Sequence, residues 1–217
     1  MTNTQLISEL KEAIIQGIPA KAVELANQIV LEKIDPVEAI EEGLKAGIAV
    51  VGDGFANGQL YLPDLVLSAE TLKAASAILE AEIKRTGVKR NKNGKVILGT
   101  VRGDLHDIGK TILATLLTAN GFDVIDLGVN IPAEVFIETI KREKPDVIGM
   151  SSLLTSTAKE LANVIVKLKA EGMRDSVMVV VGGGAVTEAF ARQIGADGFG
   201  QNAGLGVKQI KLLLGLE

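Results

Sequence analysis

His106 is the only histidine of the chain, and the chain has no cysteine. Because soft and borderline metal ions prefer imidazole or thiolate ligands, His106 is the one strong nitrogen or sulfur ligand that the sequence offers. One imidazole cannot hold a bare zinc ion, since structural zinc sites use about four protein ligands and catalytic sites about three. A lone ligand makes sense where a macrocycle supplies the other positions, which points to a prosthetic group.

The residues around His106 support metal chemistry. Asp104, two positions earlier, could accept a hydrogen bond from the second ring nitrogen, fix the tautomer and raise the basicity of the ligand. Gly103 and Gly109 would let the loop turn sharply and let a flat ligand approach the backbone. Taken alone, a single histidine in such a loop is also an ordinary loop residue, so the assignment depends on the rest of the chain.

Composition excludes several classes of function. The 217 residues are 47% hydrophobic, which is enough for one core or for two domains of roughly 100 residues. Aromatic residues make up 3% and the net charge is −4, so neither stacking platforms nor a basic face for nucleic acid is expected. The first residues do not resemble a signal peptide, and no apolar run reaches membrane-spanning length. We expect a cytoplasmic protein without nucleic-acid or membrane partners.

The first half of the chain predicts a helical domain over residues 1–86. Apolar residues recur at helical spacing, and a capping Asp35 followed by Pro36 is typical of a helix start. Four helices with short connections indicate a small bundle, with expected ranges 4–16, 19–34, 35–55 and 63–83. Residues 87–94 are polar, basic and bounded by glycines, so we expect a linker there.

One turn of this helical half is unusually apolar. Phe55, Leu60 and Tyr61 cluster within residues 54–63, where a loop would normally be polar. Apolar side chains gathered at a loop indicate a surface that covers something.

The second half, residues 95–217, predicts an α/β domain. Short, continuously apolar strands alternate with amphipathic helices, which is typical of a parallel sheet covered on both faces. Five such units suit the flavodoxin-like strand order 2-1-3-4-5. The expected strands are 96–101, 124–127, 147–150, 177–181 and 196–199.

Polar residues and glycines follow three of these strands. Ligands bind outside the carboxyl ends of strands in open α/β sheets, so these loops should meet at one rim. Serine and threonine also cap helices, and glycines also make turns, so each loop has a purely structural explanation. Their convergence on the rim that holds the lone histidine favours a binding site, formed by Asp104, His106, Ser151, Ser152, Leu153, Thr155, Gly182, Gly183 and Gly184.

Three motifs in this domain resemble a known family. Asp104-Leu105-His106-Asp107-Ile108-Gly109 matches an Asp-x-His-x-x-Gly signature, Ser151-Ser152-Leu153 matches a Ser-x-Leu element, and Gly182-Gly183 matches a glycine pair. In order and in their βα context, they resemble the corrinoid proteins of methyltransferase systems and the cobalamin-binding module of methionine synthase. The resemblance covers nearly the whole chain, because residues 1–86 are similar to the family's helical cap.

The resemblance implies roles for these residues. His106 would replace the benzimidazole of cobalamin as lower axial ligand of cobalt, Asp104 would hydrogen bond to His106, and the displaced nucleotide would thread past Ser151. Thr157 matches the position of a relay serine; it keeps a hydroxyl and adds a methyl, and its membership of the relay stays open. The implied cofactor-binding set is Asp104, His106, Asp107, Ile108, Gly109, Ser151, Leu153, Thr155, Thr157, Gly182, Gly183 and Gly184, with Phe55, Leu60 and Tyr61 shielding the upper face.

The implied function is that of a methyl carrier. The protein would bind cobalamin, as methylcobalamin or a related corrinoid, and would not be a catalyst alone, since the chain shows no second catalytic constellation. Its partners would be a donor-specific methyltransferase, an acceptor methyltransferase that uses a folate or a thiol, and a reductive activase.

Two other functions compete with this one. The same domains could sense cobalamin and regulate a partner, although no basic helix-turn-helix is evident in the sequence. A flavin- or nucleotide-binding protein of flavodoxin type is disfavoured, because the loop after the first strand carries Asp and His in place of a phosphate-binding glycine and hydroxyl run.

Overall fold

A computed structural model describes residues 2–87 and 93–216 of the chain. The chain divides into two compact units, Met1–Asn91 and Lys92–Glu217. The expected linker at 87–94 contains this division, and its residues 88–92 lie outside the described residues. Each unit is described by itself below.

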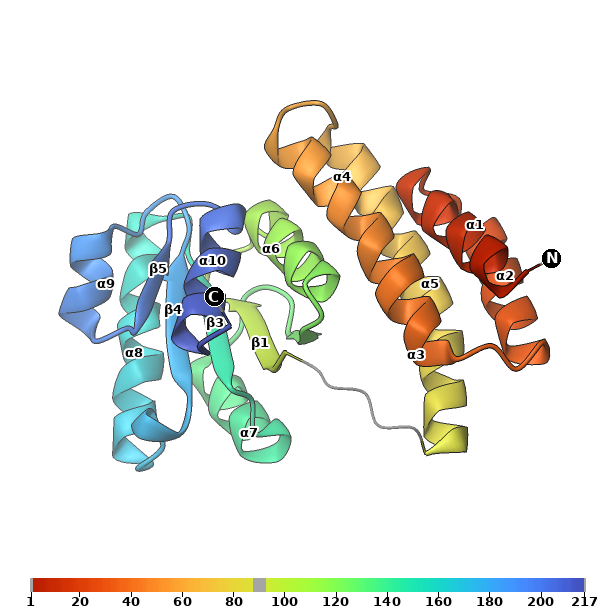
Figure 1. The fold of residues 1–217 in the computed structure, drawn as a ribbon. Helices are drawn as coiled ribbons and strands as arrows, with labels where there is room; N and C mark the ends of the chain where they lie inside the picture. Colours follow the sequence, from red (N-terminus) through yellow and green to blue (C-terminus); the bar gives the residue numbers. More distant parts are fainter. Residues whose placement is uncertain (1, 88–92, 217) are drawn as a thin grey trace. The chain divides into compact units, whose positions relative to one another are not determined.

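The first unit is helical, in agreement with the expected cap (Figure 1). Helix α2 begins at Pro19, where proline is well suited because its missing N–H would be unpaired anyway. Leu6, Leu10, Ile14 and Ile29 are fully buried between the helices. The elements are α1 Asn3–Ile15, α2 Pro19–Leu31, α3 Pro36–Glu38, the π-helical η1 Ala39–Lys45, α4 Ala46–Ala56 and α5 Leu62–Thr86.

The third helix differs from the single α-helix expected over 35–55. It begins as α3 behind Asp35, whose carboxylate accepts the N–H of Val37 at 2.9 Å, and then widens into the π-helical segment η1 before α4. Gly47 lies so close to α1 that an added Cβ would sit 2.9 Å from the carbonyl oxygen of Lys11. Only glycine therefore allows this approach of the two helices.

The second unit contains a five-stranded sheet. All its neighbouring strands are parallel and their order is β2-β1-β3-β4-β5, so the predicted topology is confirmed. The strands are short and mostly buried, as expected for a sheet that is covered on both faces. They are β1 Lys95–Thr100, β2 Asp123–Asp126, β3 Val147–Ser151, β4 Met178–Gly182 and β5 Gly198–Gly200.

Helices cover both faces of the sheet (Figure 1). Alternation along β1 separates two cores: Val96 and Leu98 join the core that includes residues of α6 and α10, whereas Ile97 joins the one that includes residues of α7 and α8. This arrangement places the ends of β1, β3, β4 and β5 at one rim, beside the start of α6. The helices are α6 Ile108–Ala119, α7 Ala133–Glu143, α8 Thr155–Ala170, the short 3₁₀ turn η2 Arg174–Ser176, α9 Glu188–Ile194 and α10 Ala203–Leu213.

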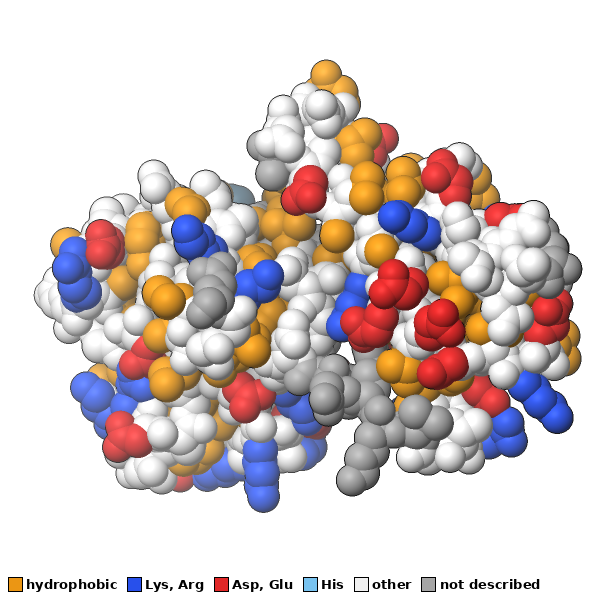
Figure 2. Space-filling model, viewed as in Figure 1, with side chains coloured by type: hydrophobic (Ala, Val, Ile, Leu, Met, Phe, Trp, Pro, Cys, Tyr) orange, Lys and Arg blue, Asp and Glu red, His pale blue; other side chains and the backbone are white. Residues whose placement is uncertain are grey.

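The surface carries charges of both signs. Figure 2 shows Lys and Arg side chains interspersed with Asp and Glu on the visible face of the second unit. Exposed pairs such as Lys141 and Glu171, 2.9 Å apart, contribute little stability because water screens them. Within residues 2–87 and 93–216, every helix is too short or too polar to cross a bilayer.

Candidate functional site

The loop between β1 and α6 holds the only histidine in a fixed position. Gly103 has a φ of +81°, which favours glycine, and its N–H donates to Oδ1 of Asn130 at 2.7 Å. The Thr100 hydroxyl donates to the carbonyl oxygen of His106 at 2.9 Å. These bonds fix the backbone while the imidazole, half exposed at 51%, stays accessible.

Asp104 lies fully buried behind the imidazole. Its Oδ1 is 2.7 Å from Nδ1 of His106 and 3.1 Å from the backbone nitrogen of the same residue. Its Oδ2 accepts the N–H of Leu153 at 2.8 Å, that of Leu154 at 3.3 Å and the hydroxyl of Thr157 at 2.8 Å. The carboxylate therefore connects the loop after β1 to the loop after β3.

These hydrogen bonds decide the ionisation of Asp104. Burial alone raises the pKa of a carboxyl group, because it disfavours the charged form. The donors from His106, Leu153 and Thr157 outweigh that effect and hold the pKa of Asp104 well below its usual value. Asp104 is therefore an anion at neutral pH, with donors from His106, Leu153, Leu154 and Thr157 directed at it.

Two hydroxyls lie beneath this carboxylate. The methyl of Thr157, the residue whose role stayed open, packs near Gly103 and leaves its hydroxyl within 2.8 Å of Asp104. Ser152, fully buried, places its hydroxyl 2.8 Å from that of Thr157 and 3.5 Å from Oδ2 of Asp104. The sequence placed Ser152 among the residues of the expected rim but did not predict its place beneath Asp104, because a serine at a strand end has several structural uses.

The geometry leaves one nitrogen of His106 available. Since Asp104 can only accept, Nδ1 carries the proton and Nε2 keeps its lone pair. Among the described residues, none hydrogen bonds to Nε2. His106 can thus offer Nε2 to a ligand with its tautomer and ring orientation already set.

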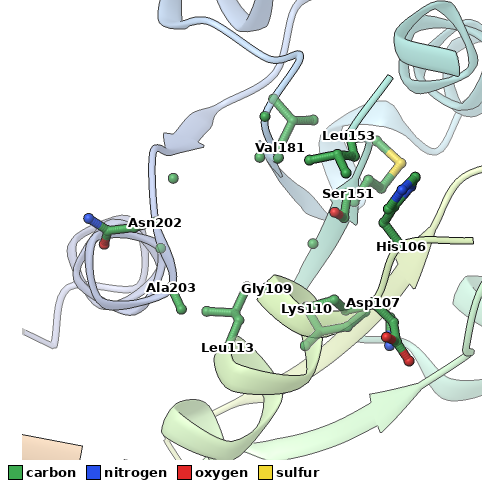
Figure 3. A pocket seen from close by; sticks show the side chains of 18 of the residues that line it. His106, Asp107, Gly109, Lys110, Leu113, Ser151, Leu153, Val181, Asn202 and Ala203 are labelled. Carbon is green, nitrogen blue, oxygen red and sulfur yellow. The ribbon is translucent and has the colours of Figure 1, made fainter. Parts of the chain in front are cut away.

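His106 stands at the edge of a cavity of about 600 Å³ in the second unit (Figure 3). Figure 3 shows Ser151 and Leu153 from one side, Gly109 and Leu113 from α6, and Ala203 from α10 around the same space. The predicted residues that line it are His106, Asp107, Ile108, Gly109, Ser151, Leu153, Gly182, Gly183 and Gly184.

Three predicted residues of this unit do not line the cavity. Asp104 lies behind His106 and contacts it directly, whereas Thr157 contacts Asp104 and is linked to His106 through it. Thr155 is the exposed first residue of α8. The prediction that Thr155 belongs to the binding site therefore has no support in the lining of this cavity.

Other lining residues escaped sequence reasoning. They come from the interior of the strands, from α6 and from the segment that joins β5 to α10. The small residues Gly200, Ala203 and Gly206, spaced by three, were a signal for the last of these segments. The additional set is Leu98, Leu105, Lys110, Leu113, Gly149, Met150, Val180, Val181, Gly200, Gln201, Asn202, Ala203 and Gly206.

Glycines shape two parts of the wall. At Gly183, with a φ of +108°, an added Cβ would lie 2.2 Å from the carbonyl oxygen of Ser152, so only glycine lets the loop after β4 approach the loop after β3. At Gly109 a Cβ would meet nothing within 4 Å, although the residue lines the cavity. Gly183 is therefore required by the packing of the protein, whereas Gly109 leaves open space beside the cavity.

The residues fit a macrocyclic metal cofactor better than a bare ion. Among residues 2–87 and 93–216, no group of three or more His, Cys, Asp or Glu side chains could hold a metal. The site instead offers one oriented imidazole nitrogen beside a largely apolar cavity, and the hydroxyl of Ser151 points into that cavity (Figure 3). One imidazole ligand would suit a macrocyclic cofactor that supplies the other ligands of its own metal.

Phe55, Leu60 and Tyr61 belong to the first unit. Phe55 and Leu60 are half-buried, and a Cβ at Gly54 would lie 2.8 Å from the side chain of Leu60, which packs against this glycine. Tyr61 is 72% exposed and its N–H donates to Asp64 at 2.8 Å, which fixes the start of α5. The assignment of these three residues to the upper face of the cofactor stays a prediction.

Comparisons with known proteins agree with this fit. Residues 94–207 match the B12 binding domain family, and residues 6–80 match a second family that is also described as a B12 binding domain. A corrinoid protein of Desulfitobacterium hafniense is 43% identical over 97% of this chain and 98% of its own length. The dimethylamine corrinoid protein 2 of Methanosarcina acetivorans is 42% identical over 97% of this chain and 96% of its own.

A solved structure shares the fold of most of the chain. The methanol:cobalamin methyltransferase complex of Methanosarcina barkeri contains a chain that is 29% identical, with a TM-score of 0.87 over 97% of this chain and 80% of that one. Both family matches and the near full-length relatives agree with the fit of these residues to a macrocyclic metal cofactor. The chain belongs to the family of corrinoid proteins, the B12-binding components of methyl-transfer systems.

Proposed function

We propose that this protein is a methyl carrier that binds cobalamin with His106 as the lower axial ligand and with the cofactor's own base displaced. It would take a methyl group from a donor-specific methyltransferase and deliver it to an acceptor methyltransferase that uses a folate or a thiol. Bound cobalamin supplies a cobalt centre that can accept and release a methyl group. The protein supplies the ligand, its orientation and the surroundings.

One observation carries the proposal. The unique imidazole presents an unbonded Nε2 at the edge of a cavity, while Asp104 holds Nδ1 at 2.7 Å. A core histidine would have both nitrogens satisfied or buried, whereas His106 is half exposed and has one nitrogen fixed. Such an arrangement is typical of a metal-ligating histidine with its supporting carboxylate.

The support behind His106 suits a ligand that must come on and off a metal. Coordination requires a neutral Nε2, so loss of the bond is linked to proton uptake by the imidazole. Asp104 stabilises the Nδ1–H tautomer and so leaves Nε2 for the metal. Thr157 donates to the far oxygen of Asp104 and keeps that carboxylate in place.

The apolar turn of the first unit would shield the reactive face of the cofactor. Tyr61 exposes most of its ring, which costs solvation unless a ligand or partner covers it. We assign Phe55, Leu60 and Tyr61 to this role on the family's pattern. Substitution of Tyr61 by Ser should speed the oxidation of the reduced holoprotein in air while leaving the spectrum of the histidine ligand unchanged.

The partners follow from the family. Relatives bear the names of trimethylamine and dimethylamine corrinoid proteins, and a similar chain occurs in a methanol methyltransferase complex. We propose that a methyltransferase specific for a small methylated donor loads this protein, and that a reductive activase restores it after oxidation.

The first experiment tests cofactor binding. Protein mixed with hydroxocobalamin should retain the cofactor through gel filtration and show a histidine-ligated spectrum, which His106→Ala should lose. Asn163→Ala, a change at an exposed position of α8, should behave as the wild type. If His106→Ala and the wild type give the same spectrum, the ligand assignment is wrong.

A second experiment separates a carrier from a sensor. Holoprotein incubated with a panel of donor methyltransferases and isotopically labelled methanol or methylamines should acquire the label on its cofactor. A protein that binds cobalamin tightly and takes up no label from any donor enzyme would instead support a regulatory function.

A further inference from the structure

The deep wall of the cavity in the second unit is almost entirely apolar. Leu98, Met150 and Val180 are each at most 3% exposed, and Leu113 reaches in from α6 (Figure 3). Glycine and alanine complete the surface from the other elements, at Gly149, Gly200, Ala203 and Gly206. A ligand group seated there would therefore meet hydrocarbon and backbone.

Apart from His106 and Ser151, the polar side chains that line this cavity are either engaged in an ion pair or exposed. The ammonium of Lys110 lies 2.7 Å from Oδ1 of Asp126, and Oδ1 of Asn202 accepts the N–H of Leu205 at 2.9 Å at the start of α10. Asp107 and Gln201 are exposed to solvent. Lys110 is therefore held by Asp126, whereas Asp107, Gln201 and Asn202 are exposed and do not belong to the buried wall.

Ser151 is the exception. Its hydroxyl points into the cavity (Figure 3), and within residues 2–87 and 93–216 the structure gives that hydroxyl no hydrogen-bond partner. A serine hydroxyl has one proton to donate. The cavity therefore offers one polar side-chain donor in an otherwise apolar wall.

We propose that this cavity selects corrinoids by the base of their nucleotide arm and prefers a benzimidazole to a purine. The inference rests on the proposed function, because the base can enter the cavity only if His106 has displaced it from cobalt. A benzimidazole joined to its ribose through one ring nitrogen has one nitrogen left, and that single acceptor matches the single donor of Ser151.

An adenine base matches the cavity poorly. Joined through one ring nitrogen, adenine keeps three further ring nitrogens and an exocyclic amine. Buried polar groups without partners lose the hydrogen bonds that water gave them, which lowers affinity by about tenfold or more for each such group. An apolar pocket discriminates against one added polar group by about a hundredfold at most, so we expect a difference between about tenfold and a hundredfold.

The test compares three corrinoids on the full-length protein freed of cofactor. Absorbance titrations would measure the affinity for cobalamin, for the cobamide that carries adenine in place of dimethylbenzimidazole, and for cobinamide, which lacks the nucleotide. Cobalamin should bind at least about tenfold more tightly than the adenine cobamide. Equal affinities for these two would overturn the proposal.

Cobinamide distinguishes this failure from failure of the proposed function. If cobinamide binds as tightly as cobalamin, the nucleotide makes no contact with the cavity, and displacement of the base by His106 loses its support. If cobinamide binds weakly while cobalamin and the adenine cobamide bind equally, the arm is bound and only base selection is wrong.

Two pairs of variants sharpen the result. Leu113→Gln adds a polar partner and should narrow the preference for cobalamin over the adenine cobamide, whereas Leu113→Met keeps the wall apolar and should preserve it.

Ser151→Ala should weaken cobalamin binding several-fold, and Ser151→Thr should retain most of it. Circular dichroism would check that each variant folds, and the wild-type comparison stands without them. An unchanged preference in a folded Leu113→Gln, together with unchanged cobalamin affinity in Ser151→Ala, would contradict the proposal.

Discussion

Oδ1 of Asp104 lies 2.7 Å from Nδ1 of His106, and this fully buried carboxylate also accepts donors from Leu153 and Thr157. The pair joins the loop after β1 to the start of α8, so His106, the proposed ligand, is oriented by the core of the sheet domain. Most of the consequences that can be tested follow from this connection.

Asp104→Asn should damage both the fold and the cofactor site. The amide keeps one acceptor oxygen but turns an NH₂ toward donors such as Leu153, so we expect a loss of about 1–3 kcal/mol in the free energy of unfolding of the apoprotein. Loss of the carboxylate that supports a ligating histidine typically lowers metal affinity by about 10–100-fold. Urea denaturation and cobalamin dissociation would measure the two effects. A variant as stable as the wild type that also retains cobalamin would contradict this role.

The effect of Asp104 on stability should depend on pH. Because the folded-state pKa is lowered, the unfolded state binds more protons between the two pKa values, and stability rises with pH across that window. The contribution is complete above the unfolded pKa of about 3.9 and is lost as the pH falls toward the folded value. The stability gap between the wild type and Asp104→Asn should stay constant between about pH 5 and 7 and shrink below about pH 4. Urea melts of the apoproteins at these pH values would check the sign, and a gap that widens on acidification would refute it.

Thr157 offers a matched test of its hydroxyl. Thr157→Val keeps the shape and removes the donor to Asp104, so it should lower the free energy of unfolding by about 1–3 kcal/mol. Thr157→Ser keeps the hydroxyl and should lose less than about 1.5 kcal/mol, since only a methyl is removed. Chemical denaturation of the three apoproteins gives the order, and a valine variant more stable than the serine variant would argue against the hydroxyl.

Two glycines of the cavity should respond in opposite ways. Gly183→Ala places a methyl 2.2 Å from the carbonyl oxygen of Ser152 at a positive φ, so the apoprotein should be strongly destabilised. Gly109→Ala meets no atom within 4 Å in helix α6, and it should stabilise the apoprotein by about 0.5–1 kcal/mol while weakening cobalamin binding. Thermal melts and cofactor titrations separate these effects. Unchanged cofactor affinity in Gly109→Ala would show that the cofactor does not pass this position.

Lys110 and Asp126 form an unequal ion pair. The lysine side chain is 4% exposed and the aspartate 36%. Asp126→Asn leaves a buried ammonium without a full counter-charge and should cost about 2–4 kcal/mol, whereas Lys110→Met leaves a carboxylate that water can reach and should cost about 1 kcal/mol or less. Urea denaturation of both variants tests the asymmetry, and equal losses would contradict it.

The sequence predicted the sheet and the place of the loop that holds His106 because their signals are local. Uninterrupted apolar strands fixed the five βα units, and topology rules then placed His106 and Ser151 at one rim. The π-helical segment at Ala39–Lys45 was not predicted, since an apolar pattern at helical spacing does not distinguish an α-helix from a locally widened one.

The far wall of the cavity was missed for a different reason. This wall includes the small residues Gly200, Ala203 and Gly206. Whether such residues line a cavity depends on which element lies opposite them at the end of the sheet, and the sequence does not show this. The 2.8 Å contact of the Ser152 hydroxyl with that of Thr157 was likewise not predicted. Thr155, which the family resemblance suggested, is exposed at the first turn of α8, where serine and threonine are common for helix-capping reasons.

The most direct measurement uses the fact that the chain has a single histidine. Protein labelled with ¹⁵N only in histidine, loaded with cobalamin and reduced to the Co(II) state, would be studied by electron paramagnetic resonance. If Nε2 of His106 is the axial ligand, the superhyperfine splitting should change from the triplet of ¹⁴N to the doublet of ¹⁵N. A triplet that persists in the labelled protein would show that the benzimidazole nitrogen still holds the cobalt, and would contradict the account.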